Sequence, residues 1–105
     1  MAKEEVYSIN TGNEHIVEKI LLDENLHYLH MIFGLNEGLP EHFTNSTVYI
    51  TVLRGCLTIA LEGGEDRAYP AGTLLKIPES ARMNIRNLDP ETLELIVVKA
   101  PAPVK

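Results

Sequence analysis

The chain has no tryptophan, two phenylalanines and a single cysteine, Cys56, among its 105 residues. One cysteine excludes an internal disulfide and every zinc site built from several thiolates. Lysine and arginine number 9 against 15 aspartates and glutamates, and the net charge of −6 disfavours binding to nucleic acid. No apolar run approaches the ~20 residues of a membrane span, and residues 1–5 lead into no signal-peptide apolar stretch. We therefore expect a cytoplasmic protein that binds neither nucleic acid nor a membrane.

The composition that remains is typical of one globular domain. Hydrophobic residues make up 45% of the chain and charged residues 23%, and 105 residues suffice for a single core. We expect one domain over residues 1–105. Its parts are N-terminal strands within residues 1–33, a core over residues 34–99 and an extended tail over residues 100–105.

Short segments with strand character follow one another along the chain. Six prolines and seven glycines interrupt it, and no long stretch keeps a helical stripe. β-Branched and aromatic residues in alternation favour strands, and turn residues such as Asp23-Glu24-Asn25 and Gly63-Gly64 separate them. Strands are predicted over residues 17–22, 26–33, 48–53, 57–61, 73–77, 83–86 and 93–98. This spacing indicates an antiparallel sandwich or barrel.

Residues 38–44, Gly-Leu-Pro-Glu-His-Phe-Thr, together with the next strand and Arg54-Gly55, resemble the first motif of the cupin superfamily. That motif contains a glycine, a His-x-His pair, a glutamate and a second glycine. The resemblance covers residues 34–99. It implies an all-β fold, the cupin-type antiparallel β-barrel that is also called a double-stranded β-helix or jelly roll.

The second cupin motif is present in its spacing rather than in its functional side chains. Gly72 and Pro78 frame a predicted strand, as in the motif. Ser80 then stands at a glycine place, Met83 at the histidine place and Asn87 at the asparagine place.

The four places that bind metal in cupins are largely changed here. In metal-binding cupins they hold three histidines and a glutamate, and the resemblance places His42, Thr44, Val48 and Met83 there. One imidazole with a hydroxyl and a thioether falls short of the three or four ligands in fixed geometry that divalent metals require. We therefore expect no metal and no other cofactor.

Three further histidines, His15, His27 and His30, could change that expectation. His27 and His30 are three residues apart, so on a strand they point to opposite faces. His30 alone could reach the interior and meet His42. The simpler interpretation makes all three surface or sheet-edge histidines.

Alternation along the strands places Val48, Ile50 and Met83 in the barrel interior. They are either packed core or, with His42 and Thr44, the lining of a pocket for a small, mostly apolar ligand. In the second case His42 would bind the ligand; in the first it would bond a neighbour such as Thr44.

These observations favour a small-molecule-binding or accessory protein. One alternative is a metal-dependent cupin enzyme, of isomerase or dioxygenase type, with an unusual ligand set around His42 and His30. Another is a purely structural homodimer with a filled barrel. The sequence contains no glycine-rich phosphate loop and no Gly-x-Ser-x-Gly motif, so we predict no catalytic residue.

Two segments, residues 26–33 and 93–98, are apolar on both faces. Since a barrel takes one face of each strand, the other face needs a cover. We expect a twofold partner to supply it, and therefore a homodimer with Ile96 and Val98 at or near the interface. The alternative cover is a strand over residues 6–9 of the same chain.

Overall fold

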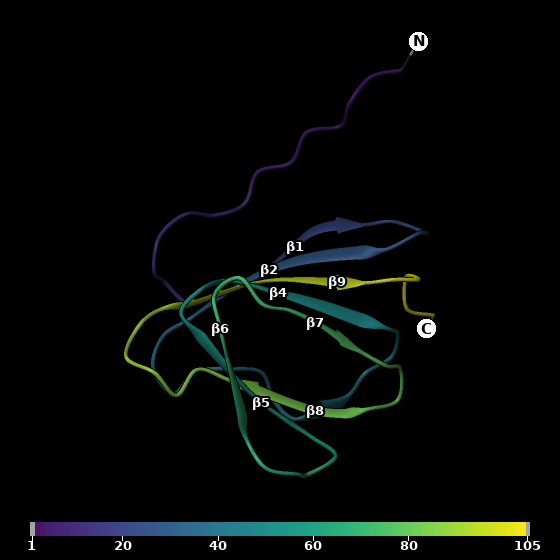
Figure 1. Ribbon diagram of the computed structural model, residues 1–105. Helices are drawn as coiled ribbons and strands as arrows, with labels where there is room; N and C mark the ends of the chain where they lie inside the picture. The colour runs from purple at the N-terminus through teal and green to yellow at the C-terminus, as the bar shows by residue number, and fades with distance from the viewer. Residues whose placement is uncertain (1, 105) are drawn as a thin grey trace.

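The computed structural model describes residues 2–104, in which nine strands and no helix form two facing sheets (Figure 1). No helix among these residues could therefore cross a membrane. The strands are β1 (Ile16–Leu22), β2 (His27–Phe33), β3 (His42–Phe43), β4 (Val48–Arg54), β5 (Cys56–Leu61), β6 (Arg67–Pro70), β7 (Leu74–Ile77), β8 (Arg82–Arg86) and β9 (Leu93–Lys99).

The five-stranded sheet has the order β1-β2-β9-β4-β7 and the four-stranded sheet the order β3-β8-β5-β6, with every pairing antiparallel. This arrangement confirms the predicted all-β fold. No described strand pairs across the two sheets, so the predicted barrel is an open pair of sheets. The terminal strands β6 and β7 belong to different sheets.

All seven predicted strands are present, with ends that move by one residue at most. The sequence analysis did not identify β3 and β6, which are the two edge strands of the four-stranded sheet. β3 has 2 residues and β6 has 4, the latter ending in a proline. Segments this short and this exposed show no alternation, which explains why the pattern did not reveal them.

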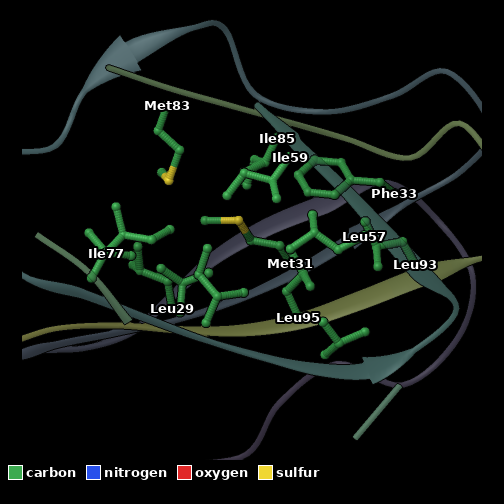
Figure 2. Close-up of a cluster of buried hydrophobic side chains, with 14 of the residues drawn as sticks. Leu29, Met31, Phe33, Leu57, Ile59, Ile77, Met83, Ile85, Leu93 and Leu95 are labelled. Carbon is green, nitrogen blue, oxygen red and sulfur yellow. The ribbon is translucent and has the colours of Figure 1, made fainter. Parts of the chain in front are cut away.

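The core lies between the sheets and is built from alternate residues of the long strands. In β2, for example, Leu29, Met31 and Phe33 face the core. Figure 2 shows the Met31 and Met83 side chains reaching toward the middle of this cluster. The other buried members of the cluster are Val48, Ile50, Val52, Leu57, Ile59, Ile77, Ala81, Ile85, Leu93, Leu95 and Val97.

The glycines of the first motif are required by close backbone contacts. Gly38 pairs with Arg86 of β8, and a Cβ at Gly38 would overlap the carbonyl of Ile85. Gly55 has φ +78°, and a side chain there would overlap the backbone of Thr92. These contacts explain why the motif keeps its glycines where the metal-binding side chains are lost.

Asn87, at the asparagine place of the second motif, is fully buried. Its amide group donates to the carbonyls of Phe33, at 3.1 Å, and Glu91, at 2.9 Å. Its side-chain oxygen accepts the amide of Asp89 at 3.0 Å. The side chain therefore joins the end of β2 to the loop before β9.

The two ends of the chain behave differently. Residues 2–9 extend away from the sheets (Figure 1), and Val6 is 81% exposed. This segment therefore forms no strand and does not cover the outer face of the five-stranded sheet, contrary to the alternative cover considered from the sequence. The C-terminal tail folds back instead, with the amide of Ala102 bonded to the carbonyl of Asn25 at 3.0 Å.

Candidate functional site

Three of the five predicted site residues, Val48, Ile50 and Met83, are buried in the core. Val48 and Ile50 come from β4 in one sheet and Met83 from β8 in the other. The three thus contribute to the same apolar interior from opposite sides.

Thr44 is 5% exposed and its hydroxyl is fully used within the protein. The hydroxyl donates to the carbonyl of Pro78 at 2.7 Å and accepts the amide of Ala81 at 2.9 Å. These bonds connect the end of β3 to the chain before β8. Thr44 therefore has an evident structural role.

His42 is half-buried on β3, directly opposite Met83 in register. Its Nδ1 lies 2.9 Å from the carbonyl oxygen of Pro40, which it can bond as a donor. The other ring nitrogen has no bond among the described residues. No group of three or more metal-binding side chains occurs within residues 2–104.

His30 lies on the outer face of the five-stranded sheet, since its neighbours Leu29 and Met31 face the core. It cannot therefore join His42 as the sequence analysis considered. It is also no surface histidine, because its exposure is 0%. Its Nδ1 lies 2.6 Å from a carboxylate oxygen of Glu18, and its Nε2 lies 2.6 Å from one of Glu94.

Both ring nitrogens of His30 are thus in hydrogen-bond contact with a carboxylate. Arg54 extends the contacts, its Nε donating to Glu94 at 2.9 Å. The four side chains, Glu18, His30, Glu94 and Arg54, form a continuous chain of contacts that we call the outer network.

The outer network holds the segment that precedes β1. The amide of Asn10 donates to Glu18 at 2.9 Å, and Arg54 donates to the side chain of Asn13 at 2.7 Å. The Asn10 amide is the main cause, and the bond with His30 the second, of a Glu18 pKa below its ordinary value. A register shift in β4 between Val52 and Arg54 brings Arg54 opposite Glu94.

The sequence pattern alone could not have revealed this network. The turn at residues 23–25 centres the β1–β2 hairpin, but unbroken pairing outward from Leu21 and Tyr28 would set Lys19 opposite His30. The register shift between Lys19 and Leu21 brings Glu18 there instead. The position of Arg54 depends likewise on the register shift in β4.

A cleft of about 510 Å³ opens between the two sheets, where β6 and β7 are the terminal strands. Its apolar walls come from both sheets, and they are formed by Ile59, Leu61, Tyr69, Leu75 and Ile77. None of the five predicted residues lines it. Three wall residues are register partners of predicted ones, since Leu61 pairs with Met83, Leu75 with Ile50 and Ile77 with Val48.

The cleft therefore lies one strand outward from the predicted interior. The sequence analysis missed this position because β6 was not identified. Charged residues stand at the rim, where Arg67 and Glu65 are 3.8 Å apart and both largely exposed. The Nζ of Lys76, also at the rim, lies 5.8 Å from the ring centre of Tyr49. The arrangement suits a molecule with an apolar body and a polar end.

No family model matches the chain. An uncharacterized protein of Methanocaldococcus jannaschii is 33% identical over 103 residues, which span 97% of this chain and 89% of that protein. Its crystal structure, described as an RmlC-like cupin family protein with a double-stranded β-helix fold, superposes with a TM-score of 0.93. In that superposition the identity is 32%, over 98% of this chain and 95% of the other.

More distant structures share the fold alone. A double-stranded β-helix protein of Klebsiella pneumoniae has a TM-score of 0.80 at 16% identity and covers 95% of this chain and 92% of its own. A Ralstonia eutropha protein, provisionally named a mannose-6-phosphate isomerase, has a TM-score of 0.69 at 18% identity. The match covers 87% of this chain and 88% of that protein.

Proposed function

The chain belongs to the RmlC-like cupin family, and on this premise we propose that it binds a small, mostly apolar molecule in the cleft between its two sheets. The cleft itself is the observation that carries this proposal. Its volume of about 510 Å³ falls within the range of small-molecule sites. The walls are apolar and Tyr69, Arg67 and Glu65 supply the few polar groups that orient a ligand.

A matched pair of charge substitutions tests the cleft. Leu61 in the wall and Leu53 on β4 are similarly exposed, at 38% and 42%, and only Leu61 lines the cleft. A small-molecule library is screened by thermal shift against the native protein, since ligands that bind the folded state raise its melting temperature. We expect Leu61→Glu to abolish the shift with a hit and Leu53→Glu to retain it. Equal shifts in both variants would exclude the cleft.

His42 is proposed as a polar contact for a ligand that reaches inward from the cleft. His42, Met83 and Leu61 stand side by side in register across β3, β8 and β5. Because His42 bonds only the Pro40 carbonyl, His42→Ala should weaken binding of a hit and cost well under 1 kcal/mol. A stability loss of about 1–3 kcal/mol with unchanged affinity would assign His42 to the fold instead.

The rival is a metal-dependent cupin enzyme, and elemental analysis separates the two. The donor set at the four cupin places offers one imidazole, one hydroxyl already bonded twice and one thioether. We expect protein purified without a histidine tag to hold well under one equivalent of zinc, iron, manganese or nickel. A chelator should leave its melting temperature unchanged. About one metal per chain would favour the enzyme.

We also propose that two copies associate through the outer face of the five-stranded sheet. Residues 2–9 extend away from this face, and Tyr28, Tyr49 and Val98 on it are only half-buried. Leu74, on the adjacent strand, is 65% exposed. A second copy of the chain would cover this surface, with a C2 dimer as the commonest arrangement.

A further inference from the structure

A second hollow lies at the β1 side of the five-stranded sheet, apart from the cleft. It measures about 340 Å³, and Lys19, His27 and Lys99 are in its lining. We call it the basic hollow. The cleft and the basic hollow share no lining residue.

The strand register explains why three basic residues meet here. Lys19 of β1 pairs with Leu29 of β2, and His27 of β2 pairs with Lys99 of β9. Residues in register share a face, and Leu29 faces the core. The three basic side chains thus stand on adjacent strands, on the inner face of the sheet, around an apolar floor at Leu29.

The C-terminal tail supplies the remaining wall. The amide of Ala100 donates to the carbonyl of Thr47 at 3.1 Å, and the hydroxyl of Ser46 donates to the carbonyl of Pro101 at 2.5 Å. The tail is thereby fixed with Pro103 and Val104 against the hollow. The site is a built concavity rather than a group of surface lysines.

Neither lysine of the basic hollow has a carboxylate partner. Within residues 2–104 all four arginines form ion pairs with carboxylates, whereas no lysine does, Lys19 and Lys99 included. No acidic residue lines the hollow. Burial, and then the charge of Lys19, lower the pKa of Lys99. Asp23, in the turn before His27, is already bonded to the amides of Asn25 and Leu26.

We propose that the basic hollow binds a small organic anion, a carboxylate on a short hydrocarbon body. The ammonium groups of Lys19 and Lys99 and the ring of His27 take the carboxylate. Leu22, Leu29 and Pro103 hold the hydrocarbon. An anion relieves the repulsion between the two lysines, and the apolar floor favours an organic acid over inorganic phosphate.

Titration calorimetry with hexanoate tests the site, with 1-hexanol and inorganic phosphate as comparison probes. We expect hexanoate to bind more tightly than either and to weaken as salt rises. Lys19→Gln and Lys99→Gln should each weaken hexanoate binding about tenfold, the size expected for one hydrogen bond to a charged group. Lys3→Gln, in the exposed segment that extends away from the sheets, is the control of matched charge and should bind hexanoate as the native protein does.

One further variant separates this site from the cleft. Leu61→Glu should still bind hexanoate, so that failure of the cleft and failure of the basic hollow are told apart. Absence of hexanoate binding to the native protein, or equal binding in the Lys19→Gln/Lys99→Gln double variant, overturns the proposal.

Discussion

The two faces of β2 bury their side chains by different means. On the inner face Phe33 reaches 0% exposure among other hydrophobic residues. On the outer face His30 also reaches 0%, yet it does so between two carboxylates at 2.6 Å. Packing stabilises the first through apolar area removed from water, and the second depends on every polar atom having a partner. Although Phe33 and His30 are equally buried, we therefore expect substitutions at the two positions to change the stability by different amounts.

The largest effect is expected on the inner face. Phe33→Ala removes a ring from the fully packed core and should destabilise the protein by about 3–5 kcal/mol. Urea denaturation followed by circular dichroism measures the loss. A loss below ~1 kcal/mol would mean that the core around Phe33 is loosely packed.

The outer network should respond less strongly but with a distinct signature. His30→Leu leaves Glu18 and Glu94 without the ring that contacts both of them and should cost about 2–3 kcal/mol. The carboxylates are 21% and 14% exposed, which limits the loss through hydration. A second change, Glu94→Gln, should recover part of it. If the double variant is less stable than His30→Leu alone, the network is not electrostatic in the way described.

A third prediction concerns what lies over the outer face. The native protein should show twice the 11.7 kDa chain mass by light scattering at micromolar concentration. Val98→Glu should halve that mass with little change in the stability of the single chain. Ile96 is less suitable for this test than the sequence suggested, because at 9% exposure a charge there would disturb the sheet itself.

Phe43→Glu is the control for the association. Phe43 lies on β3 of the other sheet and is 64% exposed. The Phe43→Glu variant should keep a light-scattering mass of twice the chain mass. Dissociation by Phe43→Glu but not by Val98→Glu would place the interface on the four-stranded sheet.

The smallest effect is the pH response of the segment before β1. Because the pKa of Glu18 is lowered, its bond to the Asn10 amide is present above the ordinary glutamate pKa of about 4.3 and is lost as the pH falls through the lowered value. The amide resonance of Asn10 should therefore titrate with a midpoint below about 4.3. Glu18→Gln should remove that titration. A midpoint at or above the ordinary value would contradict the bond.

The sequence predicted the parts of this structure that follow from local pattern. The alternation in residues 93–98 correctly placed Ile96 and Val98 on the outer face, and the motif glycines correctly indicated the fold. The cleft was missed because its walls depend on a four-residue edge strand and on which strands end each sheet. The outer network was missed because Glu94 and Arg54 meet His30 only through pairing between strands far apart in the chain.

The register shift in β4 also bears on how related chains are aligned. Val48, Ile50 and Val52 keep their places in the core, while Leu53 is the extra residue that lets Arg54 meet Glu94. A relative lacking that residue would preserve the whole core and would still place its counterpart of Arg54 opposite position 94. Alignments of such relatives should therefore open a gap between Val52 and Gly55, since an ungapped match would equate residues from opposite faces of the strand.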